Sequence, residues 1–194
     1  MSVIHLVDDD SAVTGACQFL LEGFGYAVQC WNDSETFLHQ ANLFEEGVAL
    51  LDLRMPHLDG HSLYGELLAR RSTLAVIFLT GHGDLPVAVE QMKRGAVDFL
   101  QKPVSADALI AAIERAQPTS VAACQRRAVA ARLSSLTPKE RDIARLVVGG
   151  LMNREIAERL NVAVRTVEVH RARVMEKMEA ANIADLVGKL KVMD

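Results

Sequence analysis

Five residues at the ends of predicted strands could together carry out phosphoryl chemistry. Asp8 and Asp9 follow one short apolar run, and Asp52 ends another. Carboxylates that crowd one crevice repel one another, and their hard oxygens suit Mg²⁺. A metal held by Asp9 and Asp52 would neutralise a phosphoryl group arriving at Asp52. Lys102 could supply further positive charge, and the hydroxyl of Thr80 could hydrogen-bond a phosphoryl oxygen.

Each of these residues also has an ordinary structural explanation. An aspartate at a strand end is commonly a turn residue or a helix cap, Thr80 could merely end its strand, and Lys102 alone would be a solvated surface charge. Taken singly, each residue favours that explanation. Taken together they favour a site, because function in parallel sheets lies at the carboxyl ends of the strands. Pro103 could also set a cis peptide that aims Lys102 inward.

Alternating apolar runs and helix-period segments must position these residues. We predict strands over residues 2–7, 27–30, 47–51, 74–79 and 98–101. We predict helices over 11–23, from a cap at Ser34, over 62–70, from Asp84 to Gly95, and over 105–116, with Ser11 capping the first. Five such repeats imply an α/β fold, an open parallel sheet with helices on both faces. The flavodoxin-like strand order 2-1-3-4-5 is the natural topology.

The two parts of the chain carry opposite charge. Residues 1–125 contain 7 Lys and Arg against 16 Asp and Glu, whereas residues 126–194 contain 14 against 9, so the net charges are −9 and +5. An acidic module joined to a basic one makes the second a candidate nucleic-acid binder, with chance clustering of surface charge as the alternative. We expect a first domain at 1–116, a linker at 117–133 and an all-α domain at 134–194.

Cysteine use and hydropathy predict a cytoplasmic protein with no membrane partner. Cys17, Cys30 and Cys124 are odd in number and lack a paired metal spacing, which favours reduced thiols. No N-terminal segment combines a basic stretch with a long apolar run, and no stretch approaches ~18 consecutive apolar residues.

Residues 1–116 resemble the receiver domains of two-component systems. The motifs that carry the resemblance are Val7–Asp10, Leu51–Gly60, Thr80–Asp84 and Gly95–Pro103. It implies that Asp52 accepts a phosphoryl group from a phosphohistidine of a sensor histidine kinase. It also implies Mg²⁺ bound by Asp9, Asp52 and the backbone carbonyl of Arg54, with Asp8 acting largely through water.

The same resemblance implies a switch. Thr80 and Phe99 match the residue pair in which the hydroxyl moves toward the phosphoryl group and the aromatic ring turns inward. Lys102 matches the lysine that contacts the phosphoryl oxygens. The acceptor set contains no departure from the receiver pattern.

The basic part of the chain is predicted to form helices alone. Thr137 and Glu140 indicate a helix start with a capping box. A second short helix over residues 153–160 is followed by a turn through Asn161 and a basic helix over 164–178. Two short helices with a tight turn, the second one basic, suit the major groove of DNA. The alternative is a small helical bundle whose arginines are solvated.

Residues 134–190 resemble the LuxR/FixJ-type output domain. The resemblance rests on Leu136–Arg141, Asn153–Leu160 and Arg165–Met178. It implies that the residues nearest to base edges are Glu168, Val169, Arg171 and Ala172. It also implies that five further residues lie at DNA phosphates or at the flank of the helix: Arg165, Thr166, His170, Arg173 and Lys177. One departure is Ala181–Asn182, where many relatives have a basic residue before the Asn, so a backbone contact could be missing.

Both halves and their order resemble the FixJ/NarL type of response regulator. That family implies a transcription regulator that forms a homodimer on phosphorylation, through a face that includes residues 84–104. The homodimer would bind a double-stranded DNA promoter site and act on RNA polymerase. Two rivals are a Mg²⁺-dependent phosphotransferase or phosphatase acting on a small molecule, and an atypical regulator whose receiver is a phosphorylation-independent protein-interaction module. The intact acceptor set argues against a receiver that works without phosphorylation. An enzyme acting on a small molecule would leave the basic half of the chain unexplained.

Overall fold

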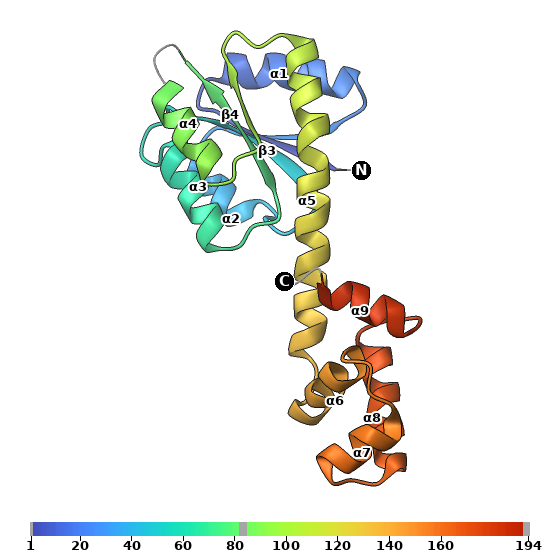
Figure 1. Cartoon of the computed structure of the whole chain (residues 1–194). Helices are drawn as coiled ribbons and strands as arrows, with labels where there is room; N and C mark the ends of the chain where they lie inside the picture. The colour runs from blue at the N-terminus through green and yellow to red at the C-terminus, as the bar shows by residue number, and fades with distance from the viewer. Residues whose placement is uncertain (1, 82–84, 192–194) are drawn as a thin grey trace. The chain divides into compact units, whose positions relative to one another are not determined.

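The chain divides into two compact units, with the boundary in the sequence after Cys124. The computed structural model describes residues 2–81 and 85–191 (Figure 1). The first unit is a five-stranded parallel sheet in the order β2-β1-β3-β4-β5, which confirms the predicted flavodoxin-like topology. Its strands are β1 (Val3–Val7), β2 (Ala27–Trp31), β3 (Gly47–Asp52), β4 (Ala75–Thr80) and β5 (Asp98–Gln101).

Helices cover both faces of this sheet. They are α1 (Ser11–Gly23), α2 (Ser34–Gln40), α3 (Gly60–Ala69), α4 (Leu85–Lys93) and α5 (Ala106–Ser134). Phe37 and Leu63, from α2 and α3, pack on one face together with α4, whereas Leu21 and Ile113, from α1 and α5, pack on the other (Figure 1). Every residue of the central strands β3 and β4 is buried, because apolar side chains cover both faces.

Two helix caps differ from those predicted, and a third lies outside the described residues. Ser11 and Ser34 are the first helical residues, and the aspartate before each serine is the cap. Asp10 Oδ1 accepts the Ala12 N–H at 2.9 Å, and Asp33 Oδ1 accepts the Thr36 N–H at 2.8 Å. The aspartates cap because they stand at the extended position from which a side chain reaches the first turn. Asp84, the predicted start of the fourth helix, lies outside the described residues.

Helix α5 is longer than the sequence predicted. We expected it to end near Ala116 and a linker to follow over 117–133, but that segment is helical throughout and contains Pro118. The helix continues because Ser120, only 1% exposed, packs against the sheet and its Oγ accepts the Gly47 N–H at 2.9 Å. The alanine-rich sequence that follows also favours helix. Despite its length, α5 is not apolar enough to cross a membrane, and neither is any other helix of the described residues.

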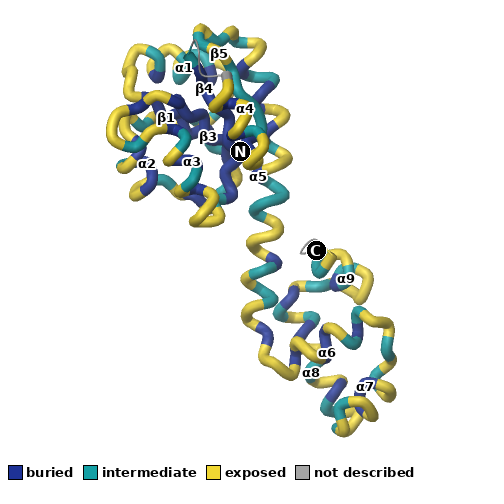
Figure 2. The backbone as a smooth tube through the Cα atoms, turned by 60° about the vertical axis from the view of Figure 1, so that its left-hand side comes forward, coloured by how far each residue is buried: buried dark blue, intermediate teal, exposed yellow. Residues whose placement is uncertain are grey.

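The second unit contains the short helices that the basic sequence predicted. After the end of α5 they are α6 (Pro138–Val148), α7 (Asn153–Leu160), α8 (Val164–Lys177) and α9 (Ile183–Lys191). The predicted capping box is present, since the Glu140 N–H donates to Thr137 Oγ1 and the Thr137 N–H donates to Glu140 Oε2. Ile143, Ile156 and Val167 are buried and belong to a hydrophobic cluster separate from those of the sheet. Figure 2 shows buried positions along α6, α7 and α8.

Candidate functional site

The structure brings the three predicted carboxylates together at the carboxyl edge of the sheet. Because β1 pairs with β3, Asp8 and Asp9 at the end of β1 lie beside Asp52 at the end of β3. One carboxylate oxygen of each lies within 4.8 Å of the others. Asp8 is 1% exposed and Asp52 is 7% exposed, whereas Asp9 is exposed to solvent. The cluster is therefore a half-covered crevice open on the Asp9 side.

Lys102 binds two of these carboxylates. Its Nζ lies 2.5 Å from Asp8 Oδ2 and 2.8 Å from Asp52 Oδ1, and the peptide bond to Pro103 is cis, as the sequence suggested. Burial raises the pKa of Asp52, and the Lys102 ammonium only partly offsets that effect. Burial alone would lower the pKa of Lys102, but its hydrogen bonds to Asp52 and Asp8 outweigh burial and raise it. Lys102 thus stays charged beside Asp52.

The donor set fits Mg²⁺. Three carboxylates share one crevice with the single ammonium of Lys102, and Mg²⁺ prefers oxygen ligands of this kind. Asp9 and Asp52 would hold the ion directly, with Asp8 close by. The bound ion would supply positive charge that neutralises an incoming phosphoryl group.

The loop between β3 and α3 folds back over Asp52. The Arg54 N–H donates to Asp52 Oδ2 at 3.1 Å, and the Gly60 N–H donates to the Leu53 carbonyl at 3.2 Å. A Cβ on Gly60 would stand 2.2 Å from the Asp52 carbonyl oxygen, so only glycine permits this approach. The loop therefore holds Arg54, whose carbonyl is a predicted metal ligand, beside Asp52.

The side chains of the predicted switch residues contact β5 and the core of the sheet. The Thr80 hydroxyl is buried and donates to the Leu100 carbonyl at 3.3 Å, on the neighbouring strand β5. Phe99 is half-buried and packs against the core on the α2–α4 side of the sheet. Both side chains would have to move for the predicted switch, which stays a prediction.

The predicted DNA-contacting residues all lie on α8, and about half of them are exposed. Arg165 and Glu168 pair with each other at 3.2 Å, and Val169, Ala172 and Arg173 are exposed. Thr166, His170 and Arg171 are partly buried, and Arg171 Nη1 donates to Asn153 Oδ1 at 2.6 Å. His170 Nδ1 is buried without a hydrogen-bond partner among the described residues.

Lys177, which the resemblance assigns to a phosphate or the helix flank, is paired within the second unit. Its Nζ binds Glu140 Oε2 at 2.7 Å and also reaches the Ser135 carbonyl at 3.3 Å. The cause is Glu140, a carboxylate only 2% exposed on α6, which needs a cation because burying an unpaired charge is costly. Lys177 therefore helps to hold α8 against α6.

Three residues that hold parts of the predicted sites in place were not among the site residues predicted from the sequence. They are Ser34, which bonds the loop after Asp52, Glu140, which binds Lys177, and Asn153, which holds Arg171. Glu140 was recognised only as part of a capping box. No local signal marks the partners of these residues, which lie 18 to 37 positions away in the chain.

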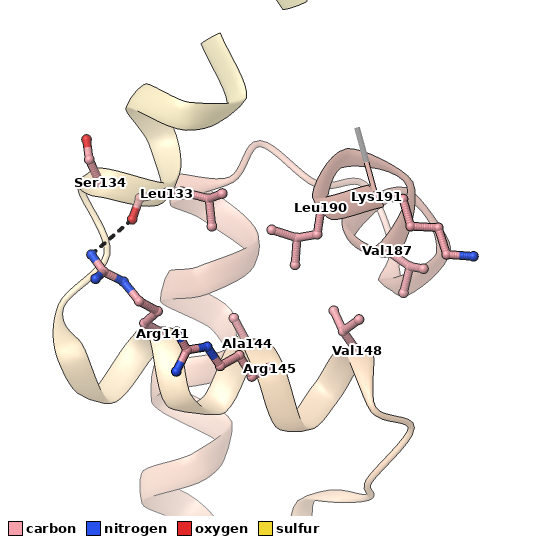
Figure 3. A pocket seen from close by; sticks show the side chains of 9 residues that line it. All are labelled: Leu133, Ser134, Arg141, Ala144, Arg145, Val148, Val187, Leu190 and Lys191. Atoms are coloured by element: carbon pink, nitrogen blue, oxygen red, sulfur yellow. Dashed lines mark hydrogen bonds between the residues drawn. The ribbon is translucent and has the colours of Figure 1, made fainter. Parts of the chain in front are cut away.

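A groove of about 610 Å³ lies in the second unit (Figure 3). Apolar side chains from α6 and α9, with Leu133 at the end of α5, form its walls, and Arg141, Arg145 and Lys191 stand among them. None of the residues predicted to contact DNA lines this groove, so it is separate from the predicted DNA-binding surface.

Comparison with known proteins agrees with this geometry. Residues 4–114 match the response regulator receiver domain family, and residues 134–190 match the luxR family of bacterial regulatory proteins. The chain belongs to the response regulators that join a phosphoacceptor receiver to a luxR-type DNA-binding domain, and it is a transcription regulator, not an enzyme.

Among its relatives is the tetrathionate response regulatory protein TtrR of Salmonella typhimurium, which is 61% identical over 193 residues, with 100% of this chain and 94% of TtrR covered. FixJ of Bradyrhizobium diazoefficiens is 40% identical, with 95% and 92% covered. The structure of StyR matches with a TM-score of 0.74 at 35% identity, covering 98% of both chains. Full-length FixJ from B. japonicum matches with a TM-score of 0.57 at 39% identity, covering 99% and 97%.

Proposed function

We propose that Asp52 is the phosphoacceptor and that it receives its phosphoryl group from a sensor histidine kinase. The convergence of Asp8, Asp9 and Asp52 on one crevice, with Lys102 bound to it, carries this proposal. An Asp52 carboxylate oxygen attacks phosphorus, the P–O bond forms, and the P–N bond to the kinase histidine breaks. Lys102 stabilises the charge that spreads over the phosphoryl oxygens, and a Mg²⁺ ion held by Asp9 and Asp52 would supply further positive charge.

Phosphorylation then shifts an equilibrium of the receiver. The Thr80 hydroxyl exchanges its bond to the Leu100 carbonyl for one to a phosphoryl oxygen, and Phe99 turns inward. These movements bias the face formed by α4 and β5, where Val87 and Val89 are already exposed apolar side chains. Two phosphorylated receivers pair through that face, within residues 84–104.

Pairing of the receivers delivers two DNA-binding domains to two half-sites. Each α8 enters a major groove with Glu168, Val169, Arg171 and Ala172 toward the bases. Once one domain of the dimer has bound its half-site, the other domain is held close to the second half-site. The affinity for the promoter therefore rises although each domain makes the same contacts as before. The bound homodimer then acts on RNA polymerase. A protein that contacts promoter DNA and RNA polymerase in this way would act in the cytoplasm.

The similarity to TtrR supports a role in the response to tetrathionate. We infer that the partner kinase senses tetrathionate and that the regulated genes encode a reductase for it. Immunoprecipitation of the tagged chain with its bound DNA tests this inference. Promoter fragments should be enriched from cells given tetrathionate and stay at background in cells given thiosulfate. Equal enrichment under both conditions would exclude tetrathionate as the signal.

Arg173 offers a test of the predicted DNA surface, because it is exposed on α8 and was assigned to a phosphate or the helix flank. Arg173→Ala should weaken binding about equally for all DNA sequences and lower the slope of log affinity against log salt by about 1. Fluorescence anisotropy at several salt concentrations measures both quantities. Arg126→Ala is the control, because Arg126 is also exposed and its replacement removes the same charge from α5. If both variants behave alike, Arg173 makes no specific phosphate contact.

A further inference from the structure

The loop between β3 and α3 is tied to α2 by one buried hydroxyl. Ser34, the first residue of α2, is 2% exposed. Its Oγ donates to the Leu58 carbonyl at 2.8 Å and lies 3.6 Å from Met55 Sδ. A buried hydrogen bond of this kind holds the loop in one place, because breaking it leaves a polar group unpaired inside the protein.

The loop also contains an uncommon backbone conformation next to a cavity. His57 has a φ of 66°, a backbone conformation that residues other than glycine rarely adopt. A cavity of about 110 Å³ lies between the start of α2 and the loop, lined by Asp33, Glu35, Pro56 and their neighbours. The loop therefore has room to shift toward α2 if the bond from Ser34 is lost.

The position of this loop matters at the carboxylate crevice. Arg54 lies in it, and its N–H donates to Asp52 Oδ2 at 3.1 Å. At the far end of the loop, Gly60 packs directly on the Asp52 carbonyl oxygen. A shift at Leu58 would be transmitted along this short segment to Arg54, and so to the carbonyl that completes the predicted metal site.

We propose that Ser34 is a positioning residue for the metal and phosphoryl site. It touches neither the metal nor the phosphoryl group, and it acts by holding the loop that carries Arg54 beside Asp52. The inference rests on the proposed role of Asp52 and deepens it. Removing a group that orients a metal ligand typically weakens metal binding by about ten- to a hundredfold.

A Mg²⁺ titration of the full chain tests this role, with affinity read from the amide chemical shifts around Asp52. Ser34→Ala should raise the dissociation constant for Mg²⁺ about tenfold. Ser120→Ala is the matched control, because Ser120 is equally buried and its hydroxyl bonds the backbone at the opposite end of β3. It should lower thermal stability and leave the Mg²⁺ affinity unchanged. If Ser34→Ala does not fold, Ser34→Cys keeps the shape with a weaker donor and should also lose affinity.

The possible results separate the two proposals. Equal Mg²⁺ affinities for wild type and Ser34→Ala, with affinity lost in Asp9→Ala, would overturn the role of Ser34 and leave the acceptor site standing. Equal weakening in Ser34→Ala and Ser120→Ala would show a general loss of stability and would also overturn it. If Asp9→Ala binds Mg²⁺ as wild type does, the proposed site itself fails.

Discussion

Asp52→Asn should abolish phosphorylation-dependent dimerisation and the gain in DNA affinity that follows from it. The substitution replaces the attacking carboxylate by an amide that cannot accept a phosphoryl group, while the size of the side chain is unchanged. With Mg²⁺ and beryllofluoride, a phosphoryl mimic, wild type should double its mass in solution and bind a two-half-site DNA about 100-fold more tightly. Asp52→Asn should do neither.

Asp33→Asn is a suitable control for this experiment. Asp33 is exposed and caps α2, and asparagine caps a helix as well as aspartate does. This variant should dimerise like wild type. Dimerisation of Asp52→Asn would place the acceptor elsewhere. A wild type that stays monomeric with beryllofluoride but gains DNA affinity would show activation within a single chain.

Glu140→Gln should destabilise the DNA-binding domain in a pH-dependent way. The hydrogen bond from Lys177, together with that from the Thr137 N–H, lowers the pKa of Glu140 from 4.5 to about 2. A carboxyl whose pKa is lower in the folded state stabilises the fold at pH values above its usual pKa. That contribution is complete above about pH 5 and is lost as the pH falls from 4.5 toward 2.

Calorimetry of the full chain between pH 2 and pH 7 measures this effect. Glu140→Gln should lower the unfolding temperature of the second unit most strongly at neutral pH, and the difference from wild type should vanish near the pKa of about 2. Glu155→Gln is the control. Glu155 is the third residue of α7, as Glu140 is of α6, and it accepts the N–H of the capping residue Met152, but it is exposed. A difference that does not change with pH would mean that the Glu140 charge contributes no stability.

The sequence predicted the sheet and its carboxylates well for a physical reason. The apolar runs specify parallel strands, parallel strands align their carboxyl ends, and Asp8, Asp9 and Asp52 stand at those ends. Lys102 follows the same rule, at the end of β5. The strand order and the clustering of these residues are therefore consequences of topology and could be predicted without coordinates.

Contacts between distant side chains could not be predicted in this way. Lys177 has the sequence context of a solvated basic residue, and only the packing of α6 against α8 brings Glu140 to it. Ser34 has the context of a helix cap, yet its hydroxyl bonds a loop instead. The full length of α5 was not predicted because residues 117–133 were interpreted as a linker, whereas Ser120 docks the helix on the sheet within that segment.

The strand that ends in Asp52 is bracketed by two glycines. A Cβ on Gly47 would stand 2.6 Å from the Val3 carbonyl oxygen, and a Cβ on Gly60 would stand 2.2 Å from that of Asp52. Every amino acid that a point mutation can substitute for glycine carries a Cβ. Purifying selection should therefore keep both positions almost invariant in descendants of this gene. Asp52 is thereby protected in evolution by residues that have no side chain.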